Sequence, residues 1–134
     1  MTTRIFRPAR RRFAAIALAL ATLVGTSVVV VAQSRREFNV TGRRYNFQVS
    51  GNEASEIRVM QNDLVHVIFT AEDIPHSFTI EEQPYRIMRR AEPGKPVSFD
   101  FRADHAGRFR FFCNLTADPK CREMHGTLVV EPNR

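Results

Sequence analysis

The feature that most constrains this fold is a two-residue alternation of apolar and polar side chains that recurs along the chain. It appears in residues 45–50, 56–59, 65–69, 97–103 and 108–111. Such alternation places one face of a strand on a core and the other in water. Turn residues separate these runs, and residues 126–131 (GTLVVE) predict a final strand that is buried on both faces. About seven short strands at this spacing predict an all-β fold, an antiparallel sandwich or barrel, in a single domain.

The positive charge of the chain is concentrated at its N-terminus. The 134 residues carry a net charge of +6, but five arginines lie within the first twelve residues, which contain no acid. The remaining residues comprise 15 basic and 14 acidic side chains. Because the body of the protein is close to neutral, its charge does not indicate a nucleic-acid partner.

The N-terminal segment has the organisation of an export signal. A basic region, residues 1–12, precedes twenty uncharged residues, 13–32, that end in Val30-Val31-Ala32. This plan predicts a signal peptide over residues 1–32 with cleavage before Gln33. The apolar run is also long enough to remain as a membrane anchor. Either interpretation makes residues 33–134 the functional domain and places it outside the cytoplasm, in the periplasm or secreted.

Two residues with metal-binding chemistry are predicted to point inward at strand ends. His76 shares the alternation phase of Phe78, and Cys113 shares that of Phe111. An imidazole and a thiolate together suit a soft metal ion such as copper or zinc. The residues therefore favour a buried metal site.

The segment after Cys113 adds three more candidate ligands, Cys121, Met124 and His125. Each also has a purely structural alternative. Cys113 and Cys121 can form a disulfide, because the predicted compartment is oxidising and the number of cysteines is even. Met124 can fill a gap in the core, and His76 can be a core histidine bonded to a carbonyl.

Three segments resemble the cupredoxin family. Residues 73–80 (DIPHSFTI) resemble the strand that carries the first copper histidine, and residues 107–113 (GRFRFFC) resemble the strand that delivers the copper cysteine. Residues 124–130 (MHGTLVV) are similar to the closing strand after the ligand loop. The resemblance extends from Phe38 to Glu131. It is closest to small secreted cupredoxin-like domains and to the copper domain of cytochrome oxidase subunit II.

This resemblance implies a Greek-key β-sandwich with copper as its cofactor. Carried over by position, it implies a mononuclear site in which His76, Cys113 and His125 bind the ion. Such a site transfers single electrons to a redox protein partner. Since the sequence shows no substrate-pocket motif and no nucleophile–base pair, we expect an electron carrier rather than an enzyme. We expect the domain to be a monomer, and to contact a membrane only if the N-terminal segment is retained.

The ligand loop departs from the family pattern and leaves alternatives open. Eleven residues separate Cys113 from His125, and Leu128 stands where an axial methionine would follow. Cys121 could instead bridge two coppers in a binuclear site, or Met124 could be the axial ligand with His125 a bystander. Met124 and His125 cannot easily reach one metal together, because neighbours on a strand point to opposite faces. Copper storage or delivery, and a metal-free sandwich with a Cys113–Cys121 disulfide, complete the alternatives.

Overall fold

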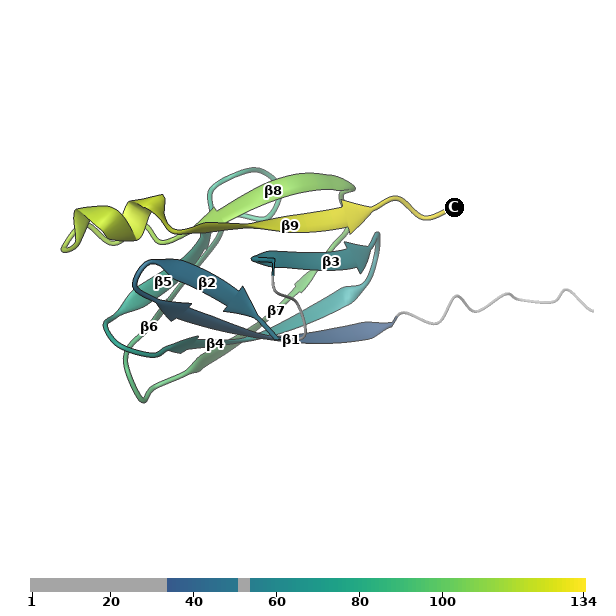
Figure 1. Cartoon of the computed structure of the whole chain (residues 1–134). Helices are drawn as coiled ribbons and strands as arrows, with labels where there is room; N and C mark the ends of the chain where they lie inside the picture. Colours follow the sequence, from purple (N-terminus) through teal and green to yellow (C-terminus); the bar gives the residue numbers. More distant parts are fainter. Residues whose placement is uncertain (1–33, 51–53) are drawn as a thin grey trace, which may run out of the picture. The chain divides into compact units, whose positions relative to one another are not determined.

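A computed structural model describes residues 34–50 and 54–134 of the chain, so the predicted signal or anchor segment lies outside the described residues. Within these ranges the structure contains no helix with the length and apolarity that a bilayer crossing requires. The described residues form nine strands and one short 3₁₀ helix (Figure 1). In chain order these are β1 (Arg35–Arg43), β2 (Asn46–Val49), β3 (Glu56–Met60), β4 (Leu64–Ala71), β5 (His76–Ile80), β6 (Ile87–Ala91), β7 (Val97–Arg102), β8 (Gly107–Phe112), η1 (Pro119–Glu123) and β9 (His125–Glu131).

The strands form two sheets that pack as a sandwich. One sheet has the order β2-β1-β4-β7 and the other the order β3-β9-β8-β5-β6. The prediction of an all-β sandwich is confirmed, but the sheets are mixed rather than purely antiparallel. β1 runs parallel to β4, and β3 runs parallel to β9. Alternation alone could not show this, because it gives the face of each residue but not the direction of strands that are distant in the sequence.

The core between the sheets is built from the apolar positions of the alternating runs. On β4, Val65, Val67 and Phe69 are fully buried, as the alternation predicts. The rings of Phe78 and Phe111 stack with their centroids 4.6 Å apart, which joins β5 to β8. Aromatic pairs of this kind add about 0.5–1.5 kcal/mol beyond the burial of their area. This aromatic cluster fixes the strands that carry the metal-binding candidates.

Two strands, β1 and β6, were not apparent from the alternation. Most residues of β1 are exposed or half-buried, although the strand lies inside its sheet between β2 and β4. The outermost strand β6 buries only Ile87 and Ala91, at its two ends, and exposes the three residues between them. Neither strand has the regular apolar face on which the prediction depended.

The segment between β8 and β9 folds back on itself. The Asp118 carboxylate accepts a hydrogen bond from the Lys120 N–H (3.1 Å) and caps η1, and Cys121 is the buried residue of this short helix. The Met124 N–H then donates to the Cys121 carbonyl (3.1 Å), and the Cys113 N–H donates to the Met124 carbonyl (3.4 Å). These bonds bring Cys121 back to the end of β8, where Cys113 lies.

Candidate metal centre

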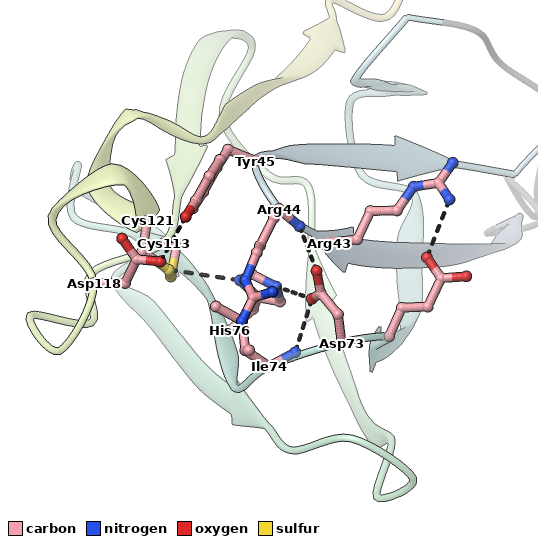
Figure 2. Close-up of polar contacts among 10 residues, drawn as sticks. Arg43, Arg44, Tyr45, Asp73, Ile74, His76, Cys113, Asp118 and Cys121 are labelled. Atoms are coloured by element: carbon pink, nitrogen blue, oxygen red, sulfur yellow. Dashed lines mark hydrogen bonds and ion pairs between the residues drawn. A yellow bond between two sulfur atoms is a disulfide. The ribbon is translucent and has the colours of Figure 1, made fainter.

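His76 begins β5 and is completely buried. Its Nε2 atom lies 2.8 Å from Oδ1 of Asp73, and its Nδ1 atom lies 3.5 Å from Sγ of Cys121 (Figure 2). An ionised carboxylate only accepts hydrogen bonds, so Nε2 carries the proton that faces Asp73. In the neutral ring Nδ1 then presents its lone pair toward the sulfur. A histidine that donates its other N–H to a carboxylate is the usual arrangement of a metal-binding imidazole.

The Asp73 carboxylate is fixed by hydrogen bonds from three groups. Besides His76, it accepts from the backbone N–H of Arg44 (2.9 Å) and from that of Ile74 (2.8 Å). Desolvation acts to raise the pKa of Asp73, but these hydrogen bonds outweigh it and lower the pKa from 3.8 to about 2. Asp73 is therefore ionised at neutral pH and orients the His76 ring. The sequence pattern contained Asp73, three residues before the histidine, but gave no sign of this role.

Cys113 and Cys121 form a disulfide, with their Cα atoms 5.4 Å apart. This is one of the alternatives that the sequence left open. The predicted inward orientation of His76 and Cys113 is confirmed, since both side chains are fully buried. Cys121 is buried as well. The two cysteines that the sequence offered as thiolate ligands are therefore joined by a disulfide bond in this structure.

His76, Cys113 and Cys121 form a compact group of metal-binding residues. One nitrogen and two sulfur atoms lie within 4.8 Å of one another. In the disulfide form the imidazole is the one strong ligand of the three, because metal binding requires thiolates. Reduction of the disulfide gives an imidazole and two thiolates in one buried place. That donor set fits copper or zinc.

Met124 and His125 lie on opposite faces, as expected for neighbours on an extended strand. Met124, which caps the end of η1, is buried. His125 begins β9, is exposed, and has its Nδ1 atom 2.8 Å from the carbonyl oxygen of Glu123. The structure does not bring His125 into the group of His76, Cys113 and Cys121. The third residue beside His76 and Cys113 is Cys121, whereas the resemblance implied His125.

A polar contact that the sequence analysis missed joins β5, which begins at His76, to the end of β8, which precedes Cys113. Ser77, directly after His76, is buried, and its hydroxyl donates to Oδ1 of Asn114 (2.7 Å) while accepting from the Asn114 N–H (2.8 Å). Asn114 directly follows Cys113. The clamp therefore holds the residues next to two of the three donors. Its one sequence signal is that a polar residue directly follows both His76 and Cys113.

Comparison with solved structures identifies the architecture, although no protein-family model matches the sequence. The periplasmic domain of subunit II of cytochrome oxidase (CoxB) of Bradyrhizobium japonicum is similar with a TM-score of 0.64 at 17% identity, over 78% of this chain and 89% of that chain. Auracyanin A, a "blue" copper protein from Chloroflexus aurantiacus, is similar with a TM-score of 0.58 at 15% identity, over 73% of this chain and 100% of that one. The chain has the cupredoxin fold.

The cupredoxin fold also occurs within larger enzymes. Blue copper oxidase from Nitrosomonas europaea is similar with a TM-score of 0.56 at 23% identity, over 75% of this chain and 40% of that chain. The similarity to these solved structures confirms the cupredoxin-like architecture that the three sequence motifs predicted. At these identities the likeness establishes the fold, and the function has to be argued from the site.

Proposed function

We propose that the chain is an exported copper protein that transfers single electrons, and that it binds copper when Cys113 and Cys121 are reduced. The observation that carries this proposal is the buried group of His76, Cys113 and Cys121, whose donor atoms lie within 4.8 Å of one another. Imidazole and thiolate ligands suit copper. The fold shared with a "blue" copper protein supports the same cofactor.

Each residue of the group has a defined task. His76 offers Nδ1, while its Nε2–H is held by Asp73. Cys113 and Cys121 offer their sulfur atoms once the bond between them is reduced. His76 and Cys113 are fully buried, so water is kept from these two donors. Bound copper would supply a reversible change between Cu(I) and Cu(II).

Met124 and His125 have different roles in this proposal. Met124 is buried next to the cysteine segment, and we keep it as a candidate further donor. His125 is exposed and belongs to the alternative ligand set of His76, Cys113 and His125. Substituting it therefore tests that alternative. The binuclear site, in which both cysteines bridge two coppers, uses the same sulfur atoms and differs in the number of ions bound.

Electron transfer fits the site better than catalysis does. His76 and Cys113 are fully buried, so a substrate has no direct access to them, whereas an electron does not need contact with the donor. The partner is accordingly proposed to be another redox protein. A buried disulfide also fits an oxidising compartment outside the cytoplasm, in agreement with the export signal expected at the N-terminus.

The test is copper titration of the full chain in two redox states. The disulfide is reduced, the reductant is removed without air, and Cu(I) or Cu(II) is added while visible absorption, EPR and bound copper are measured. We expect the reduced chain to take up one equivalent, with a thiolate-to-copper absorption band in the Cu(II) form, and the disulfide form to take up none. Failure of the reduced chain to bind would leave a metal-free sandwich and would overturn the proposal.

Single substitutions distinguish the ligand sets. We expect His76→Ala and Cys121→Ser to abolish tight binding, and His125→Ala to leave it intact. Loss of binding in the His125→Ala chain, with binding retained in Cys121→Ser, would instead support the set of His76, Cys113 and His125. Two equivalents with a mixed-valence EPR spectrum would establish the binuclear site.

A further inference from the structure

A pocket of about 420 Å³ lies beside the disulfide. Its walls combine apolar residues (Ile74, Pro75 and Leu115) with two arginines (Arg44 and Arg90), and Cys121 is part of its lining. The residues come from the β1–β2 turn, the segment before β5, strand β6 and the segment after β8. The pocket therefore reaches one of the two cysteines of the buried disulfide.

The charge of this pocket is positive. The Arg44 guanidinium has no ion pair or hydrogen bond among residues 34–50 and 54–134, and Figure 2 shows its side chain at the same end of the sandwich as His76 and Cys121. Arg90 makes one long contact, 3.5 Å, with Glu92. The one acid in the lining, Asp118, already accepts hydrogen bonds from the Tyr45 hydroxyl (3.0 Å) and the Lys120 N–H. An anionic ligand is favoured here.

The two cysteines of the disulfide differ in their position relative to this pocket. Cys121 lines it, although only 1% of the residue is exposed. Cys113 is fully buried and is not part of the pocket lining. A molecule seated in the pocket thus meets Cys121 first. Exchange at a disulfide depends on which sulfur is accessible to the attacking thiolate.

We propose that this pocket is a thiol–disulfide exchange site for a carboxylate-bearing, low-molecular-weight thiol, and that Cys121 is the sulfur attacked. Arg44 and Arg90 would hold the carboxylate, and the apolar wall would receive the carbon chain. The thiolate forms a bond to Sγ of Cys121, the Cys113–Cys121 bond breaks, and the electron pair leaves on Cys113, which takes a proton. A second thiolate then attacks the small-molecule sulfur of the mixed disulfide. Cys121 leaves as a thiolate and takes a proton, and the two small molecules depart joined as their own disulfide.

The biological meaning of this exchange rests on the proposed function, because its product is the dithiol form that we propose to bind copper. The exchange itself needs no metal. It is therefore tested in copper-free protein. Failure of the exchange in this test is then a separate result from failure of the copper titration.

The first experiment compares thiols of different charge on the full-length oxidised chain. Reduction is followed with 3-mercaptopropionate as the anionic probe and 2-mercaptoethanol as the neutral probe. We expect Arg44→Gln to slow reduction by the anionic thiol by roughly 1.5-fold to fivefold, the effect of losing one exposed ion pair. Reduction by 2-mercaptoethanol should stay unchanged. Arg36→Gln, an exposed arginine of β1 outside this pocket, is the matched control and should alter neither rate.

The second experiment asks which sulfur reacts. Cys113→Ser leaves Cys121 as a single thiol, and Cys121→Ser leaves Cys113. We expect the dicarboxylate reagent 5,5′-dithiobis(2-nitrobenzoate) to modify the Cys121 thiol at least about ten times faster than the Cys113 thiol, because only Cys121 lines the pocket. Both thiols should react equally fast after unfolding in urea, which controls for the reagent.

The two experiments can each overturn the proposal. Equal slowing of both thiols by Arg44→Gln, or no slowing of either, would remove the anion-binding role of the pocket. Faster modification of Cys113 than of Cys121 in the folded chains would assign the attacked sulfur to the other cysteine. If a cysteine variant fails to fold, mass spectrometry of the wild-type mixed disulfide, trapped in acid and digested, still identifies the modified sulfur.

Discussion

The two ring nitrogens of His76 have different partners, and this division determines what the residue can do. Nε2 faces the Asp73 carboxylate at 2.8 Å, and Nδ1 faces the Cys121 sulfur at 3.5 Å. A core histidine needs one acceptor to satisfy its N–H. Here that need is met by Asp73, and the second nitrogen is left directed at the sulfur atoms. The arrangement favours a role for His76 as a metal ligand over a role in core packing alone.

Asp73 gives the first prediction at this scale. Its pKa is lowered to about 2 in the folded chain, from 3.8. A lowered carboxyl pKa stabilises the fold fully above pH 4, and this stabilisation disappears as the pH falls through 2. We expect Asp73→Asn to lower the free energy of unfolding at pH 6 by roughly 1 kcal/mol, a value reduced for solvent screening of a partly exposed group. Urea unfolding at pH 6 and at pH 2 measures the difference.

The difference in the free energy of unfolding between Asp73→Asn and the wild type should become smaller toward pH 2. The control is Glu37→Gln, an exposed carboxylate with no ion pair or hydrogen bond within the part of the chain that the structure describes. It should show no deficit at either pH. A deficit in Asp73→Asn that is the same at both pH values would mean that the carboxylate acts through its shape alone.

At the scale of elements, strands β5 and β8 are joined near the site by a side-chain clamp rather than by a long ladder. Their backbone pairing includes Thr79 opposite Phe112. The Ser77–Asn114 clamp adds two hydrogen bonds of 2.7 and 2.8 Å beside this pair. Since Ser77 follows His76 and Asn114 follows Cys113, the clamp sets how far apart the two candidate ligands lie.

Removing this clamp should be costly because the site is buried. Ser77→Ala leaves the half-buried Asn114 N–H without its acceptor. A fully buried unsatisfied group costs about 1–3 kcal/mol, so we expect a loss at the lower end, about 1 kcal/mol. Chemical denaturation of the oxidised chain measures this loss. Ser98→Ala, on an exposed position of β7, is the matched control and should change the stability by less than about 0.5 kcal/mol. Equal stability of the two variants would show that water replaces the serine hydroxyl.

The elements also show why part of the fold and site was predictable. Strand β4 was evident because Val65, Val67 and Phe69 all face the core. Strand β6 was not, since its middle residues are exposed. The inward positions of His76 and Cys113 followed from the phase of regular strands. That Cys121 and not His125 lies beside His76 did not, because η1 lies between β8 and β9 and alternation has no meaning across a short helix.

At the scale of the whole molecule, the sandwich and the disulfide contribute separately to stability. The aromatic core joins both sheets, with Phe47 of β2 lying 5.2 Å from Phe111 of β8 between ring centroids. The disulfide closes a short loop at one end of the sandwich, between β8 and η1. We therefore expect the reduced chain to remain folded, which copper binding by the dithiol form requires.

Reduction should nevertheless lower the stability measurably. A loop as short as the one between Cys113 and Cys121 corresponds to about 2–3 kcal/mol in the chain-entropy description. Urea unfolding of the oxidised and reduced full chain, both free of metal, measures the difference. The Cys113→Ser/Cys121→Ser double variant should match the reduced wild type. If the reduced chain showed no cooperative transition, the disulfide would be a condition of folding and the dithiol copper site would be excluded.

The position of β9 has a consequence for the order in which the molecule is assembled. β9 is the last strand of the chain, yet it lies between β3 and β8 inside its sheet. Because a chain is synthesised from its N-terminus, β3 stays without this neighbour until residues 125–131 have been added. Such distant pairing is slow to form. Cys121 and Met124 immediately precede β9, so the end of the sandwich that holds the disulfide is completed only when this strand pairs.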